Sequence, residues 1–226
     1  MAPLYSARSR AIEPFHVMAL LARANELQSQ GHDVIHLEIG EPDFTTAAPI
    51  VAAGQAALAA GHTRYTAARG LPALREAIAG FYRQRYGLDI DPQRIMITPG
   101  GSGALLLAAS LLVDPGKHWL LADPGYPGTL LSRDELRALS QAVKDRQGHL
   151  VVDEIYHGLT YGTTAASVLE VDDDAFVLNS FSKYFGMTGW RLGWLVAPPR
   201  AIPELEKLAQ NLYISAPSMA QHAALA

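Results

Sequence analysis

The apolar residues of this chain recur with two spacings, one typical of amphipathic helices and one typical of buried strands. Helical spacing covers residues 15–30, where Gly31 ends the run, and residues 71–86. Ser132 and Glu135 have the spacing of a capping box, which predicts that another helix begins there. An apolar stretch after the glycine-rich turn at residues 98–103 predicts a further helix.

Short runs of consecutive apolar residues predict strands between these helices. The runs lie in VIHLEIGEPDF, RIMITPGGSG, HWLLADPGYP, HLVVDE, AFVLNS and RLGWLVAP. Continuous apolar strands that alternate with helices indicate an α/β architecture, in which a mostly parallel sheet has helices on both faces.

Candidate functional residues follow several of these predicted strands. They are Gly101 and Ser102, Tyr126, Asp153 and Tyr156, and Ser180, Ser182 and Lys183. In open α/β sheets ligands bind outside the carboxyl ends of the strands, so we expect these segments to meet at one edge.

Lys183 is one of four lysines and lies in SFSKYFGMTGWR, residues 180–191. Its aromatic neighbours are expected to desolvate the amine, which lowers a lysine pKa and favours attack on a carbonyl. Arg191 offers a guanidinium that suits phosphate. A lysine beside a phosphate site suggests a phosphorylated aldehyde held as a Schiff base, and pyridoxal 5'-phosphate is the obvious candidate. The ordinary alternative is a surface lysine in a turn.

The other segments fit the same ligand. TPGGSGAL exposes backbone N–H groups at a helix N-terminus, which binds phosphate, although such turns also serve as plain connections. Asp153 could pair with a pyridine nitrogen and Tyr156 with the phenolic oxygen; alternatively they are a capping aspartate and a packed tyrosine. Tyr126 could stack on the ring or cover the local core.

Composition excludes several other classes of function. A formal net charge of -4 offers no basic field for nucleic acid. With no cysteine, thiolate metal sites and disulfides are impossible. No metal site emerges from the histidines either, because His62 and His157 have no matching carboxylate or second histidine at metal-ligand spacing, and we interpret them as ordinary. No apolar run has the length of a membrane span and no signal peptide is recognisable, so we expect a cytoplasmic protein.

With these residues the chain resembles class I/II aminotransferases of pyridoxal-phosphate fold type I over almost its whole length. The motif Ser180-Phe-Ser-Lys183 followed by Gly189-Trp-Arg191-Leu-Gly193 carries the resemblance. It implies an enzyme that moves an amino group between an amino acid and a 2-oxo acid through a Schiff base on Lys183. It also implies that Ser180, Arg191, Gly101 and Ser102 bind the phosphate, while Asp153, Tyr156 and Tyr126 contact the ring.

Two further segments extend the resemblance. HTRYTAARGLPALREAI matches the family segment whose tyrosine, here Tyr65, reaches the phosphate of a neighbouring subunit, which implies a homodimer. LEIGEPDF matches the stretch whose glycine, here Gly40, lies against the substrate carboxylate. We therefore expect residues 1–45 to be an N-terminal arm and small-domain remnant, and residues 46–226 to be the large cofactor-binding domain.

The chain departs from the family pattern in two places, so we expect an incomplete large domain. DPGYP runs directly into GTLLSRDEL, without the Asn-Pro-x-Gly turn, which predicts a missing segment near residues 127–128. The arginine that clamps the substrate carboxylate in the family has no counterpart, because no arginine follows Arg200. Two alternatives stay open: β-elimination by a related lyase, or an impaired remnant that binds the cofactor or dimerises.

Overall fold

The computed structural model describes residues 4–122 and 130–226. Two compact units are present, Met1–Glu41 and Pro42–Ala226. The first contains the short helix α1 (Ala7–Ala11) and α2 (His16–Ser29), which confirms the predicted helix ending before Gly31. The second contains the sheet and all other elements, and it carries most of the predicted site residues.

The sheet of the second unit has four strands in the order β1-β4-β3-β2. They are β1 (Ile95–Thr98), β2 (Val151–Asp153), β3 (Phe176–Ser180) and β4 (Gly193–Val196). β2 pairs with β3 in parallel, whereas β4 lies antiparallel between β3 and β1. Three strands therefore run in one direction and one runs against them, so the sheet is mixed.

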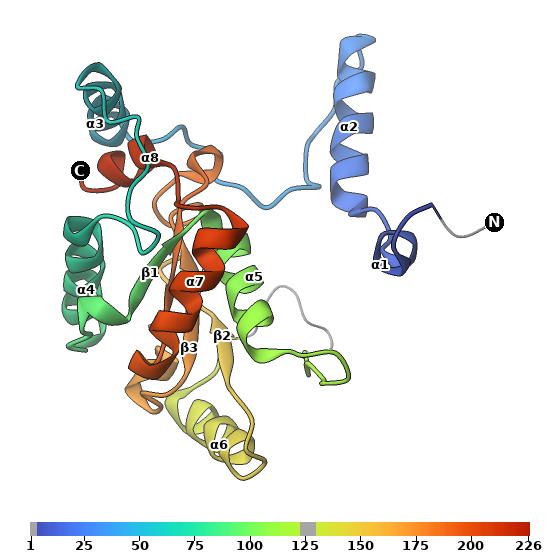
Figure 1. Ribbon diagram of the computed structural model, residues 1–226. Coiled ribbons are helices and arrows are strands. Elements are labelled where there is room, and N and C mark those ends of the chain that lie inside the picture. The colour runs from blue at the N-terminus through green and yellow to red at the C-terminus, as the bar shows by residue number, and fades with distance from the viewer. Residues whose placement is uncertain (1–3, 123–129) are drawn as a thin grey trace. The chain divides into compact units, whose positions relative to one another are not determined.

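Helices cover both faces of this sheet, as predicted. Side chains alternate along the strands: Ile95 and Ile97 pack with α4 (Pro72–Tyr86), whereas Met96 packs with α5 (Gly100–Leu112) and α7 (Ile202–Leu212). Figure 1 shows α5 and α7 along one side of the sheet and α4 along the other. Each face thus has its own apolar core, and the strands are buried between them.

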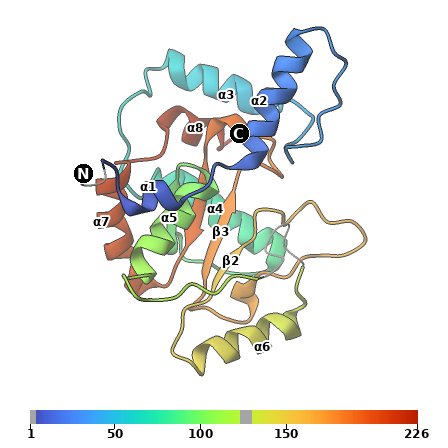
Figure 2. The same cartoon turned by 90° about the vertical axis from the view of Figure 1, so that its right-hand side faces the viewer.

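The remaining helices follow from local sequence signals. α6 (Arg133–Lys144) begins with the predicted capping box, in which Ser132 N–H donates to Glu135 Oε2 at 2.8 Å. α3 (Ala48–Ala59) and α8 (Ser218–Ala223) lie side by side in both views (Figure 2). No helix of the described chain is both long and apolar enough to span a bilayer.

Two predicted strands are absent from the described residues. Residues 34–44 and 118–122 form no ladder, and Ile35 and Leu120 are 82% and 96% exposed. An apolar run forms a strand only where a neighbouring strand satisfies its backbone groups, and these two segments have none. The end of the second run, from Asp123 onward, lies outside the described residues.

Candidate active site

The predicted site segments meet at one edge of the sheet because of the strand directions. β1, β2 and β3 all end at this edge, and β4 begins there, with Gly193 opposite both Thr98 and Ser180. The residues that follow the first three strands and the residues that precede the fourth are therefore neighbours. This brings together Gly101, Asp153, Ser180 and Arg191, which are far apart in the sequence.

A cradle without side chains lies where α5 begins. Gly100 has φ +71°, and a Cβ built on it would lie 2.5 Å from Nη2 of Arg191. A Cβ on Gly101 would lie 3.7 Å from Cβ of Ser180. Glycine at both positions leaves the first turn of α5 open beside the guanidinium, where backbone N–H groups and a cation can face the same anion. Ser102 is exposed on this same turn.

Ser180 and Ser182 form a buried hydroxyl pair next to the cradle. Ser180 Oγ lies 2.9 Å from Ser182 Oγ and donates to the carbonyl of Leu192 at 3.0 Å. Arg191 itself is exposed, with φ +54°, and its Nη1 donates to the carbonyl of Thr188 at 3.0 Å. The donor set of helix N-terminus, hydroxyl and guanidinium fits a phosphate group.

Lys183 is half-buried in the loop between β3 and β4. The loop is closed by hydrogen bonds from Gly186 N–H to the carbonyl of Lys183 and from Met187 N–H to that of Phe181. Thr46, which lies outside this loop, binds it through two hydrogen bonds. Its Oγ1 donates to the carbonyl of Gly186 at 2.7 Å and accepts from Trp190 Nε1 at 3.0 Å. The amine is thus carried by a fixed loop, three residues beyond the end of β3.

Asp153 and Tyr156 lie on the turn that follows β2. Asp153 is exposed at the strand end, where its Oδ1 accepts from Ile155 N–H at 3.0 Å. Although the residue is exposed to solvent, the protein atoms packed around the carboxyl partly desolvate it and raise its pKa, and the bond from Ile155 opposes this shift. Gly158, with φ +105°, closes the turn under the ring of Tyr184, since a Cβ there would lie 2.5 Å from that ring. The Asp153 turn is thereby packed against the loop of Lys183.

Two titratable residues of this turn received no role in the sequence analysis, which did not single out Glu154 at all. Glu154 is fully buried, and its Oε2 lies 3.5 Å from Nδ1 of His157. Burial raises the pKa of Glu154 to about 7 and lowers that of His157 to about 4. The sequence analysis treated His157 as an ordinary histidine, whereas the structure places a buried carboxylate next to its ring. In the sequence, this pair is indicated by an acidic residue and a histidine that lie three residues apart after a predicted strand.

These two residues make the stability depend on pH in opposite ways. In the folded state Glu154 stays protonated up to a higher pH than its ordinary pKa of 4.5 would give. Its contribution to the free energy of unfolding therefore falls by roughly 3 kcal/mol as pH rises from 4.5 to 7. His157 stays neutral in the folded state, so its contribution falls as pH drops from 6.5 to 4. In Glu154→Gln only the second effect remains. Urea unfolding from pH 4 to 8 should show a steeper loss toward acid in this variant; identical profiles would contradict it.

The described structure does not test the roles of three predicted site residues. Tyr65 is 78% exposed and lines a hollow of about 260 Å³ with His62, Arg64 and His222. Gly40 belongs to the N-terminal unit, and Tyr126 lies outside the described residues. Their roles stay predictions.

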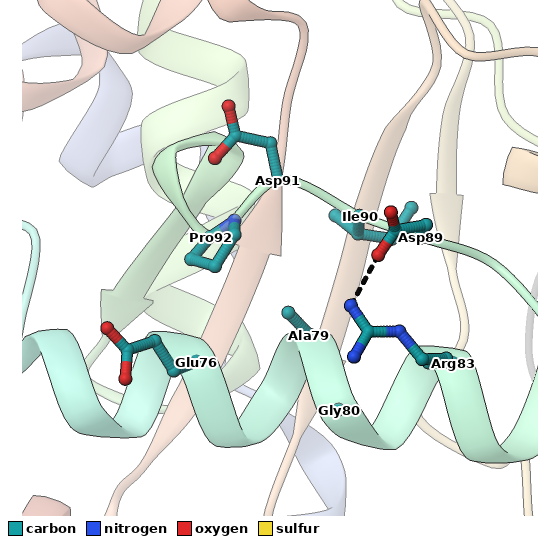
Figure 3. A pocket seen from close by; sticks show the side chains of 8 residues that line it. All are labelled: Glu76, Ala79, Gly80, Arg83, Asp89, Ile90, Asp91 and Pro92. Atoms are coloured by element: carbon teal, nitrogen blue, oxygen red, sulfur yellow. Dashed lines mark hydrogen bonds and ion pairs between the residues drawn. The ribbon is translucent and has the colours of Figure 1, made fainter.

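A larger hollow, of about 400 Å³, lies elsewhere, between α4 and the 3₁₀ turn Pro92–Arg94 (Figure 3). Glu76 and Arg83 reach it from α4, and Arg83 pairs with Asp89 across the opening. Its eight lining residues include none of the predicted site residues. In the described part of the chain no group of three histidine or acidic residues has the arrangement of a metal site.

Solved structures resemble this fold closely. An aminotransferase from Mycobacterium tuberculosis matches with a TM-score of 0.90 and 30% identity, over 99% of this chain and 71% of that one. A Methanococcus jannaschii structure, described as similar in its active site to kynurenine aminotransferases, matches with a TM-score of 0.87 and 35% identity, over 98% and 72%. The unit is therefore an incomplete large domain of pyridoxal-phosphate fold type I.

The sequence comparisons give the family. The family model of class I and II aminotransferases matches residues 32–128 and 127–226. The (5-formylfuran-3-yl)methyl phosphate transaminase of Methanocaldococcus jannaschii is 36% identical over 98% of this chain and 71% of its own length. Valine--pyruvate aminotransferase of M. tuberculosis is 31% identical over 95% and 69%. This chain belongs to the class I and II aminotransferase family, as its motif indicated, and it is an aminotransferase.

Proposed function

We propose that this chain uses pyridoxal 5'-phosphate, held by Lys183, to move an amino group between an amino acid and a 2-oxo acid. The observation that carries the proposal is the contact between Arg191 and the glycine cradle of α5, next to the loop of Lys183. When bound, the cofactor supplies an aldehyde that combines with amines and a ring that accepts the electrons of a Cα–H bond. The ends of β1, β2 and β3, which meet at one edge of the sheet, all contribute residues suited to binding the cofactor.

Each residue has a distinct task in this proposal. The Arg191 guanidinium, the first turn of α5 with Gly101 and Ser102, and Ser180 with Ser182 would hold the phosphate. The Asp153 carboxylate would hold the ring nitrogen in its protonated form, and the Tyr156 hydroxyl would bind the phenolic oxygen. Nζ of Lys183 would hold the aldehyde carbon until the substrate amine displaces it. The freed amine would then take the Cα proton and deliver it to the former aldehyde carbon.

Replacing Arg191 tests the phosphate site. Arg191→Asn suits the left-handed backbone at this position and removes a charge-assisted contact, so affinity for pyridoxal phosphate should fall roughly 10- to 100-fold. Affinity for pyridoxal, which lacks the phosphate, should change little. Fluorescence titration measures both, with Arg200→Asn on the exposed ion pair to Asp174 as the control. An equal loss for both ligands would contradict the assignment.

The reaction type is tested on reconstituted protein with a panel of amino acids. Transamination consumes the visible absorbance of the bound cofactor and releases a 2-oxo acid without ammonia. Release of ammonia would favour the lyase alternative, and an unchanged spectrum with every amino acid would favour a binding remnant.

We further propose a cytoplasmic homodimer in which Tyr65 contacts the phosphate of the neighbouring subunit. The high exposure of Tyr65 supports this, because its ring is available to a second copy. Sedimentation of the purified chain tests it: a monomer at micromolar concentration would contradict it.

We also propose that a family segment is missing between Pro127 and Gly128. The two matched parts of the family model meet at this point, and the alignment with the M. jannaschii transaminase runs over 264 positions although this chain has 226 residues. Sequencing the gene across these two codons tests it.

A further inference from the structure

The residues at the end of β2 alternate between the site and the core. Asp153 is exposed at the edge of the sheet, whereas Glu154 is fully buried. Glu154 N–H donates to the carbonyl of Leu178 at 2.8 Å, so strand pairing continues through this residue. Successive side chains of a strand point to opposite faces. The side chain of Glu154 therefore holds this segment from the face opposite to Asp153, the residue proposed to contact the cofactor ring.

One oxygen of Glu154 ties this segment to the next turn of the chain. Oε1 accepts from Ser167 Oγ at 2.8 Å and from Val168 N–H at 2.9 Å, at the start of the 3₁₀ turn Val168–Glu170. The carbonyl of Glu154 accepts from His157 N–H at 2.9 Å. The side chain and backbone of Glu154 together fix the turn that presents Asp153 and Tyr156.

The other oxygen has a different environment. Oε2 is buried and, among the described residues, receives no hydrogen bond; its neighbour is Nδ1 of His157 at 3.5 Å, which lies 3.1 Å from the hydroxyl of Tyr86. An ionised carboxylate would leave this oxygen without a donor, which is costly in a buried site. A carboxylic acid instead carries its own O–H, which faces the ring nitrogen.

The charged groups around the pair act mostly in favour of the neutral forms. Glu170 of the 3₁₀ turn and Asp153 of β2 repel a negative Glu154, while the hydrogen bonds from Val168 and Ser167 oppose this effect. Arg85 of α4 repels a positive His157, and the smaller influence of Glu170 opposes it. Tyr82 and Tyr86 face the acid from α4 as neutral groups. Burial, which raises the pKa of Glu154 and lowers that of His157, also favours the neutral form of both residues.

We propose that Glu154 is a positioning residue of the site: as a neutral acid whose O–H faces Nδ1 of His157, it anchors the turn that carries Asp153 and Tyr156. A neutral Glu154 adds no second negative charge behind Asp153, which leaves Asp153 as the anion that faces the ring nitrogen. This role rests on the proposed function, since it matters to catalysis only if the cofactor ring binds there.

The proton is tested on the full chain without cofactor. Infrared difference spectra between the wild type and Glu154→Gln at about pH 6, below the pKa of Glu154, should contain the carbonyl band of one carboxylic acid that the variant lacks. The band should disappear between pH 6 and pH 8 as the acid ionises. A difference that shows only carboxylate bands at pH 6 would overturn the proposal.

The anchoring role is tested by amide hydrogen exchange, also without cofactor. The Val168 amide reports the bond to Glu154, and the Ile155 amide reports the Asp153 turn. Glu154→Leu should raise both exchange rates roughly tenfold more than Glu154→Gln, which keeps an acceptor oxygen. Glu204→Leu, on the exposed ion pair of α7, is the matched control. Equal protection in the Leu and Gln variants would overturn the anchoring role.

A third measurement links the turn to the site. Glu154→Leu should weaken binding of pyridoxal phosphate and of pyridoxal by similar factors, because it disturbs ring contacts, unlike Arg191→Asn. A loss confined to the phosphorylated ligand would overturn the assignment to the ring side. If the wild type binds neither ligand, the proposed function fails, while the infrared and exchange measurements still decide the role of Glu154 in the fold. If Glu154→Leu does not fold, the infrared comparison with Glu154→Gln still decides whether the acid is neutral.

Discussion

Replacing Lys183 with alanine is expected to slow the half-reaction with an amino acid by roughly 10⁴-fold, because the same amine holds the aldehyde and transfers the Cα proton. Cofactor binding through the phosphate should persist, since Arg191 and the α5 cradle are unchanged. Single-turnover kinetics on protein reconstituted with pyridoxal phosphate measure this, through the loss of the cofactor's visible absorbance.

Lys207→Ala provides the matched control for this experiment. Lys207 pairs with Glu204 on the exposed face of α7, and its loss removes one lysine without touching the sheet edge. Its half-reaction rate should stay within about twofold of the wild type, as expected for an exposed ion pair. A Lys183→Ala protein that retained the wild-type rate would disprove the assignment of the catalytic amine.

Replacing Gly193 with alanine is expected to lower the free energy of unfolding by about 3 kcal/mol or more. A Cβ there would lie 2.6 Å from the carbonyl carbon of Gly100, 2.8 Å from the carbonyl oxygen of Asn179 and 2.8 Å from the nitrogen of Gly101. All three are backbone atoms, so none can rotate away, and β4 must separate from β3 or from α5. The urea midpoint at neutral pH measures the loss.

Gly80→Ala is the control that separates this clash from a general effect of removing glycine. Gly80 lies inside α4, and among the described residues no heavy atom other than those of its chain neighbours and of the adjacent helix backbone lies within 4 Å of its added Cβ. Alanine there should stabilise the protein by about 0.5–1 kcal/mol. If Gly193→Ala shifted the midpoint in the same direction, the contact between β4 and α5 would not have the role described.

The sequence predicted those elements whose signals are local. The capping box at Ser132 identified the start of α6, and consecutive apolar residues identified β1, β3 and β4. It failed at residues 34–44 and 118–122, where the same apolar pattern has no neighbouring strand among the described residues. Strand formation depends on long-range pairing, which composition does not reveal. The antiparallel direction of β4 was likewise not visible in its residues.

The candidate site shows the same division between local and long-range information. Motif spacing selected Lys183, Arg191 and Asp153 as candidates, because their residue types suit one chemistry, and their roles stay predictions. Glu154 was missed, since a buried acid within an apolar strand resembles any polar residue at a strand end. Only the structure shows that its carboxyl contacts Ser167 and Val168 and faces His157.

The antiparallel direction of β4 has a consequence for how this part of the molecule can change in evolution. Residues 181–192 leave and re-enter the sheet at adjacent positions, because Ser180 and Gly193 are paired. The amine and the guanidinium therefore belong to one hairpin, whose closed base sets the distance between them. Insertions and losses of other sheet segments leave that distance intact, so the hairpin is a unit that could be grafted onto another antiparallel strand pair.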